Sequence, residues 1–303
     1  MAAEKMDHRA AANCAFIGAA LFLISAILFG TGFGIEFSAN VAASETHIDM
    51  MNSTQRRADF NSWQELDVTV LKRRWEGRIA SQTPHLLAEL LAAVAWFTTL
   101  PPVSSAALVS GGNSRSATRV LYNCFVAIAA ISTVDFTFQA GTVSMTDWLA
   151  TWPVMDANHT HDGGFGALQA LELDFLVSSS RTVWLFALDD LLLAIALITA
   201  AFLTYTGKQF NRCWAHYSVA IAGVSAIGFC LMVFRLVSWR YVAMIAGLVT
   251  GITDAILLPI WMVALGVQLR RISNEGTYAA SMSKGPSNDV EMNAGGNTVE
   301  QRA

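Results

Sequence analysis

The sequence predicts an all-α protein, a polytopic membrane helical bundle of six transmembrane helices with both termini cytoplasmic. Hydrophobic residues make up 54% of the 303 residues and charged residues only 14%, whereas a soluble protein carries about 25% charged residues. Several apolar runs exceed the roughly 20 residues that a helix needs to cross a bilayer. The alternating segments of a transmembrane barrel are missing. This composition excludes a soluble enzyme, a nucleic-acid-binding protein and a disordered scaffold.

Six apolar runs predict the spans in order. The first has no charged residue, the second is interrupted by Pro101 and Pro102, and three residues separate the last two, which we therefore expect to be antiparallel neighbours. The predicted spans are 14–35, 86–109, 118–140, 181–205, 213–237 and 241–269. They form a transmembrane domain over 14–269, between a cytoplasmic N-terminus (1–13) and a disordered cytoplasmic tail (270–303) rich in Gly, Ser and Asn.

Two long outer loops are expected, over 36–85 and 141–180. The first contains an amphipathic stretch, 56–79, with an apolar stripe and many basic residues. Such a stretch suits a helix lying in the headgroup region, or alternatively a lid over the bundle. The second contains a weaker apolar stretch, 163–180, which carries Glu172 and Asp174. We expect this stretch to be a re-entrant or surface helix rather than a seventh span.

The distribution of basic residues predicts the orientation. Each short segment on the side of the termini carries Lys or Arg close to a span, as the positive-inside rule expects of the cytoplasm. These residues are Lys5, Arg9, Arg115, Arg119, Lys208, Arg212, Arg270 and Arg271. Two N-x-[ST] sequons, at Asn52 and Asn158, fall in the two expected outer loops. Their use would make the protein a glycoprotein of the plasma membrane or of another secretory-pathway membrane.

Acidic residues inside the spans are the main functional signal. A charged residue costs roughly 2.5–3.5 kcal/mol at the centre of an inserted helix, so such residues face the bundle interior and often mark ion or proton pathways. Four acids lie within spans, and Glu89 and Arg235 lie near outer span ends. The predicted ion or proton site comprises Asp254, Asp135, Asp189, Asp190, Arg235 and Gln139.

Helical spacing adds detail to this prediction. Ser132, Asp135 and Gln139 share one helical face, which predicts a polar stripe turned inward. The run Ala243, Gly247, Gly251 and Ala255 predicts a close helix contact beside Asp254. We expect Pro259, just beyond, to disturb the sixth span. His85 precedes Glu89 by four residues, a spacing that places the two side chains on one face.

Other chemistry finds weaker support. His159, His161, Asp156 and Asp162 could ligate a metal ion, but the motif is short and lacks a confirming partner. No nucleophile elbow, zinc-protease helix or phosphate-binding Gly loop occurs, so catalysis has no clear candidate and no cofactor is indicated. A lysine for a retinal Schiff base is missing from every predicted span.

Two functions remain open at this stage. The buried carboxyl groups favour a small proton- or cation-linked transporter or channel subunit in the lipid bilayer. The alternative is a non-catalytic receptor, sensor or scaffold whose outer loops bind a partner protein. Convergence of the acidic side chains in one cavity would favour the first function, and scattering over separate helix contacts would favour the second.

Overall fold

The protein is built from long helices. The computed structural model describes residues 8–50, 68–110, 115–150, 164–207, 209–234 and 241–283. The elements are α1 (His8–Met50), α2 (Val68–Ser110), α3 (Arg115–Ala150), α4 (Gly164–Gly207), α5 (Arg212–Phe234), α6 (Tyr241–Ile252), the π-helix η6 (Thr253–Leu257) and α7 (Leu258–Ser283). No strand occurs among these residues, so the all-α prediction is confirmed for them.

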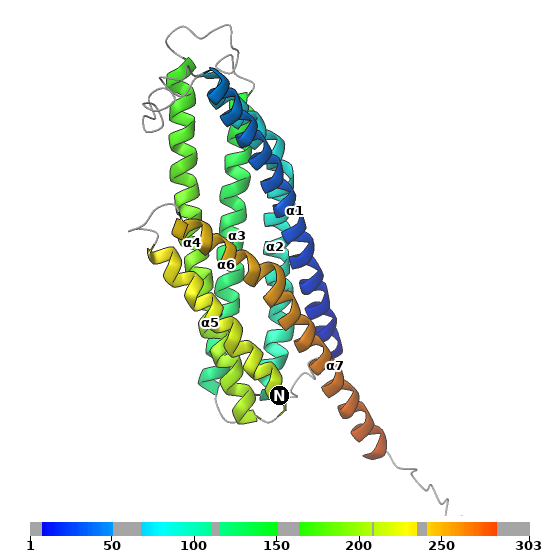
Figure 1. Cartoon of the computed structure of the whole chain (residues 1–303). Helices are drawn as coiled ribbons and strands as arrows, with labels where there is room; N and C mark the ends of the chain where they lie inside the picture. The colour runs from blue at the N-terminus through cyan, green and yellow to red at the C-terminus, as the bar shows by residue number, and fades with distance from the viewer. Residues whose placement is uncertain are drawn as a thin grey trace, which may run out of the picture.

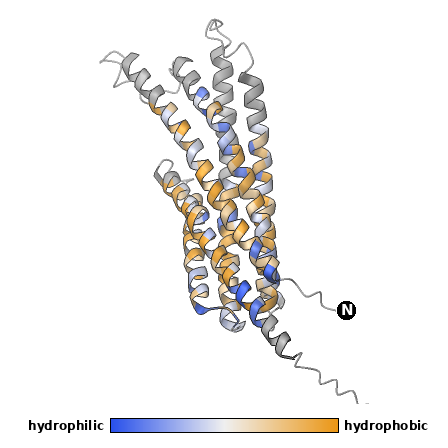
Figure 2. Cartoon of the chain, turned by 90° about the vertical axis from the view of Figure 1, so that its right-hand side faces the viewer, coloured by the Kyte–Doolittle hydropathy of each residue, from blue (hydrophilic) through white to orange (hydrophobic). Residues whose placement is uncertain are grey.

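Six helical segments are long and apolar enough to cross a membrane, as the sequence predicts. They are His8–Ala39, Trp75–Ser110, Ser116–Thr142, Trp184–Gly207, Arg212–Phe234 and Ile245–Glu275. Helices α6, η6 and α7 together supply the last segment. Hydrophobic residues predominate along the middle of the bundle, and hydrophilic residues gather near helix ends (Figure 2).

The helices form an elongated bundle (Figure 1). Helix α1 packs along α2 and α7, α3 packs against α2 and α4, and α5 packs against α4 and α6. The end of the bundle where α1 begins is called here the N-terminal end, and the opposite end the far end. Helices α1–α4 continue well past the far ends of the shorter α5 and α6 (Figure 1). The α5–α6 pair is therefore recessed relative to the rest of the bundle.

The expected loops over 36–85 and 141–180 are helical wherever the structure describes them. Helix α1 continues to Met50, α2 begins at Val68, α3 continues to Ala150 and α4 begins at Gly164. At about 1.5 Å per residue, a 43-residue helix is roughly 65 Å long, about twice the thickness of a bilayer core. Parts of α1–α4 must therefore extend beyond the lipid hydrocarbon. Polar sequence did not end these helices, because helix propagation needs favourable backbone and packing rather than apolar side chains.

Two expectations about these segments need correction. The stretch 163–180 is no separate re-entrant or surface helix, since from Gly164 it is the first part of the continuous helix α4. The described half of the amphipathic stretch belongs to α2 and packs along α1 instead of lying apart from the bundle. Trp75 is buried there, and Arg78 forms a salt bridge of 3.5 Å with Glu36 of α1.

The C-terminal tail is also more ordered than predicted. Helix α7 continues from the sixth span to Ser283. Arg271 pairs with Glu275 one turn later at 2.7 Å, a spacing that supports an exposed helix. Arg270 stacks over the ring of Phe16 in α1 at 5.6 Å. The tail beyond Ser283 lies outside the described residues.

A column of aromatic rings crosses the core in the N-terminal half of the bundle. It contains Phe22, Trp96, Phe125, Trp261, Trp214 and Phe210, and neighbouring ring centroids are 5.0–6.2 Å apart. Trp261 stacks between Phe125 and Trp214, and its indole N–H donates to Ser218 Oγ at 2.8 Å. The column joins α1, α2, α3, α5 and α7, and it leaves this half of the bundle densely packed.

The sixth span is irregular, as Pro259 led us to expect. The irregularity is a π-helical turn, Thr253–Leu257, which begins before the proline and carries Asp254. Proline lacks the N–H that would bond four residues back, and a π-turn is one way to absorb such a gap. The chain bends between α6 and α7 (Figure 1).

The small residues of the sixth span do not make the close contact that was predicted. Gly247 and Gly251 are exposed, and a Cβ added to either would meet no atom within 4 Å. Ala246 is the fully buried residue of α6. The face of Ala246 packs against the bundle instead, so α6 is rotated relative to the predicted arrangement.

Candidate functional site

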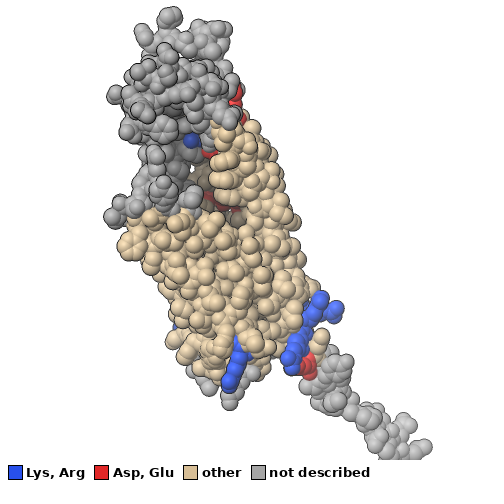
Figure 3. Space-filling model, in the orientation of Figure 1, with Lys and Arg blue, Asp and Glu red and all other residues tan. Residues whose placement is uncertain are grey.

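Five carboxyl side chains converge inside the bundle. Asp189 interacts electrostatically with Asp254, Asp135, Asp190 and Glu89, and Asp254 does so with Asp190 and Glu89. These residues come from α2, α3, α4 and η6, and we call them the carboxylate cluster. Figure 3, drawn in the orientation of Figure 1, shows a hollow in the face toward the viewer, with Asp or Glu side chains within it. Four of the five were named as site residues from sequence, and the structure brings those four together.

Asp190 is held in place by contacts with two neighbouring helices. Only 3% of it is exposed, and its Oδ2 accepts a hydrogen bond of 2.8 Å from Thr250 Oγ1 of α6. Gly228 of α5 faces the same carboxylate: a Cβ added there would lie 2.6 Å from Oδ2. Gly228 is six residues before the end of α5, or about 9 Å along the helix. The cluster therefore lies below the far end of the α5–α6 pair.

Asp189 and Asp190 point in different directions, as adjacent residues on a helix must. Asp190 turns toward α5 and α6 through Gly228 and Thr250. Asp189 interacts with the remaining members of the cluster, and its buried Oδ1 has no hydrogen-bond partner within the described part of the chain. Asp190 is thus fixed by contacts with neighbouring helices, whereas Asp189 keeps a carboxylate oxygen that can accept a hydrogen bond or bind an ion.

Four members of the cluster form no salt bridge with a basic side chain that the structure describes. They are Glu89, Asp189, Asp190 and Asp254. Arg235, which was predicted to belong to the site, lies outside the described residues. Asp135 is buried, with 3% exposed. Gln139 follows it by one turn on α3 and is partly buried.

His85 forms a different contact from the one its spacing suggested. Its Nε2 lies 3.9 Å from Glu36 Oε2 of α1, and its ring packs edge-on against Phe29 at 5.1 Å. Gly32 gives it room, because a Cβ there would lie 2.9 Å from the ring. His85 therefore links α2 to α1 through Glu36 and Phe29. Glu89 belongs to the carboxylate cluster, and His85 does not.

Metal chemistry gains no support from the described residues. Among them no group of three or more His, Cys, Asp or Glu side chains is arranged to hold a metal ion. The described members of the cluster thus act on one another electrostatically without the close grouping of three ligands that a metal centre needs. The weak metal candidates and both sequons lie outside the described residues; they are His159, His161, Asp156, Asp162, Asn52 and Asn158.

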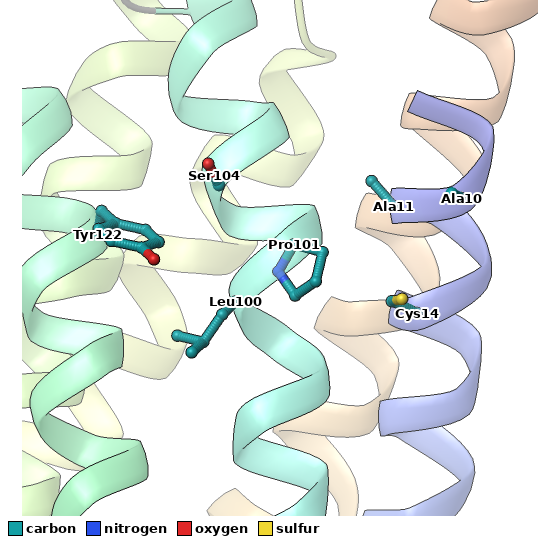
Figure 4. A pocket seen from close by; sticks show the side chains of 7 residues that line it. All are labelled: Ala10, Ala11, Cys14, Leu100, Pro101, Ser104 and Tyr122. Atoms are coloured by element: carbon teal, nitrogen blue, oxygen red, sulfur yellow. The ribbon is translucent and has the colours of Figure 1, made fainter. Parts of the chain in front are cut away.

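A separate groove lies near the N-terminal end (Figure 4). It has a volume of about 470 Å³, and its lining comes from α1, α2 and α3: Ala10, Ala11, Cys14, Leu100, Pro101, Ser104 and Tyr122. On α2, Leu100 is eleven residues from Glu89, or roughly 16 Å along the helix. The lining is largely apolar and contains no carboxylate, so this groove is separate from the carboxylate cluster.

Three contributors to the site were not predicted. Glu89 was placed at the outer membrane edge, because its span was counted from Leu86, whereas α2 begins at Val68 and Glu89 lies inside the bundle. Gly228 gave no signal in the sequence, and Thr250 was notable only because it shares a helical face with Asp254. Their roles follow from the packing of α4 against α5 and α6, which the sequence does not specify.

No protein-family model, curated protein or solved structure matches this chain. The fold and the membrane-spanning segments are therefore the basis for assigning the class of protein. Six helices of this length and apolar composition are compatible with a multi-pass membrane protein.

Proposed function

We propose that this protein is a small proton- or cation-linked membrane transporter or channel subunit, and that the carboxylate cluster is its ion site. The observation that carries the proposal is the convergence of five carboxyl groups from four helical elements. Carboxylates removed from water are strongly disfavoured unless a counter-charge, a proton or hydrogen bonds offset the loss. A bound proton or cation provides that compensation. When it is released, the buried carboxylates are again energetically unfavourable.

Asp254 is the central residue in this proposal. It lies in the π-helix η6, and single π-turns within α-helices are frequent at functional sites. It interacts electrostatically with Asp190 of α4 and Glu89 of α2. A charge bound at Asp254 would therefore be felt by two other helices, which is what ion-coupled movement requires.

The exposed arginines support an orientation for the site. Lys and Arg gather at the N-terminal end of the face in Figure 3, and Arg119, Arg212, Arg270 and Arg271 are exposed there. By the positive-inside rule this end belongs in the cytoplasm. The hollow then lies in the half of the bundle away from the cytoplasm, and the aromatic column lies in the half nearer to it. A packed column in that position favours a transporter over an open channel.

Ion flux tests this proposal. Purified protein is reconstituted in liposomes with an internal pH dye, and proton and monovalent cation gradients are imposed. We expect flux in the wild type and a loss of at least tenfold in Asp254→Asn, equivalent to about 1.4 kcal/mol or more, because asparagine keeps the shape but cannot exchange a proton or carry the charge.

Glu275→Gln is the matched control, because Glu275 is an exposed carboxylate on α7 that pairs only one turn away with Arg271. It should leave flux unchanged. Absence of flux from folded, monodisperse wild-type protein over the whole cation panel would refute the transport proposal. Full flux in Asp254→Asn would refute the central role of Asp254 in the ion site.

A receptor, sensor or scaffold is the second candidate, and one observation favours it. Helices α1–α4 continue past the far ends of α5 and α6 (Figure 1), and they could present a surface to a partner protein. In that case Asp254→Asn would change stability without any flux phenotype. The plasma membrane or another secretory-pathway membrane, with glycans on Asn52 and Asn158, fits either candidate and remains part of the proposal.

A further inference from the structure

Helix α6 is the most lightly packed helix beside the cluster. Among the described helices it packs chiefly against α5. Its exposed residues include Ile245, Gly247, Leu248 and Gly251, and neither glycine has a neighbouring atom within 4 Å of an added Cβ. The hydrogen bond from Thr250 to Asp190 at 2.8 Å ties it across to α4. Movement of α6 would have to break this hydrogen bond and the packing of Ala246 with Ala187 of α4 and Met232 of α5.

The segment that follows α6 is firmly held. Trp261, Met262, Leu265 and Leu269 of α7 are almost completely buried. On α5, the Tyr217 hydroxyl donates to the backbone oxygen of Leu257, the last residue of η6, at 2.9 Å. The loose helix and the anchored helix therefore meet at the π-turn, immediately before Pro259.

We infer that Thr250 is a positioning residue that couples the occupancy of the carboxylate cluster to the orientation of α6 about η6. This inference rests on the proposed function, because it assumes that a proton or cation occupies the cluster. An ionised Asp190 accepts the Thr250 hydrogen bond well, since bonds to a charged acceptor are stronger than neutral ones. A proton on Asp190 turns this charged acceptor into a weaker neutral one, and a cation at Asp190 competes for the same oxygen. Either event weakens the hold of α4 on α6.

Asp190 acts electrostatically on two other members of the cluster, Asp189 and Asp254. Asp189 lies beside it on α4, and Asp254 faces it from η6. Glu89 and Asp135 act on Asp189 and so on the same charge balance. Gly228 of α5 brings no charge. A proton on Asp190 itself removes the charge that accepts the Thr250 hydrogen bond, so a change of pH probes the coupling directly.

The test measures the distance across η6. Spin labels are placed at Leu248→Cys on α6 and Val267→Cys on α7, both exposed positions, in protein whose native cysteines are replaced with alanine. Distance distributions are recorded in lipid at pH 5 and pH 8. We expect a shift of several ångströms between the two pH values, no shift in Thr250→Val, and recovery of the shift in Thr250→Ser.

Thr199→Val is the control, because the Thr199 hydroxyl bonds only to the Ile195 carbonyl of its own helix at 2.7 Å. It should keep the shift. A shift that persists in Thr250→Val overturns the coupling role. So does a missing shift in wild-type protein that carries flux, and that result leaves the proposed function standing. A Thr250-dependent shift in protein without flux supports the coupling and refutes transport instead.

Discussion

Trp261→Ala should lower the free energy of unfolding by about 3–5 kcal/mol, the range for truncating a large buried aromatic side chain. Trp261 is 1% exposed. Its ring stacks on Phe125 at 5.9 Å and on Trp214 at 5.1 Å, and its N–H bonds to Ser218. The substitution removes both stacking contacts, leaves a cavity in the core and removes one of the two hydrogen-bond partners of the buried Ser218 hydroxyl.

Unfolding by a denaturing detergent in mixed micelles measures this effect. Trp184→Ala on α4 is the matched control, because Trp184 is 46% exposed and its loss should change the unfolding free energy by less than about 1 kcal/mol. Equal losses for the two variants would contradict the packed column. A proton leak in Trp261→Ala, independent of Asp254, would support the column as the barrier between the hollow and the cytoplasmic side.

The six spans were predictable because their signal is local. Each is a run of apolar residues, and a bilayer imposes its length on any helix that crosses it. The extensions of α1–α4 carried no such signal. From Ser180 to Arg181, for example, hydropathy changes but nothing interrupts the backbone, and α4 runs through both residues. A hydropathy reading therefore placed a boundary where the helix has none.

The individual acids of the carboxylate cluster could be predicted from the sequence, but their arrangement in space could not. Each buried acid is conspicuous in an apolar run, because the cost of burying it is high. Which acids meet depends on helix rotation and packing, and there local patterns mislead. The spacing of Gly247 and Gly251 predicted a buried face on α6, yet Ala246 is buried and both glycines are exposed. Asp190 instead found its partners on α5 and α6, through Gly228 and Thr250.

Gly228→Ala should disrupt the site with the smallest possible change, one methyl group. The added Cβ would lie 2.6 Å from Asp190 Oδ2 and 3.2 Å from its Cγ, so the carboxylate must move and its bond to Thr250 is lost. Overpacking of this kind costs about 1–3 kcal/mol, against a gain of up to about 1 kcal/mol from the better helix propensity of alanine. We expect a net loss of stability and a fall in flux.

Gly223→Ala on the same helix separates the cost of overpacking from the gain in helix propensity. No atom lies within 4 Å of a Cβ added there, so only the gain in helix propensity remains and stability should rise or stay constant. A similar rise in stability for Gly228→Ala would mean that the Asp190 carboxylate moves aside at no cost. The close contact between Gly228 and Asp190 would then not contribute to stability.

A double-mutant cycle then identifies the partner. In an Asp190→Ala background the clash with the carboxylate is gone, so Gly228→Ala should behave like Gly223→Ala. Residues in contact typically show interaction energies of about 0.5–3 kcal/mol in such cycles, whereas distant residues give additive effects. Additivity here would place the cost of Gly228→Ala elsewhere on α5. A coupling energy within that range would establish that a glycine holds open the position of a buried carboxylate, which links the packing of α4 on α5 directly to the proposed ion site.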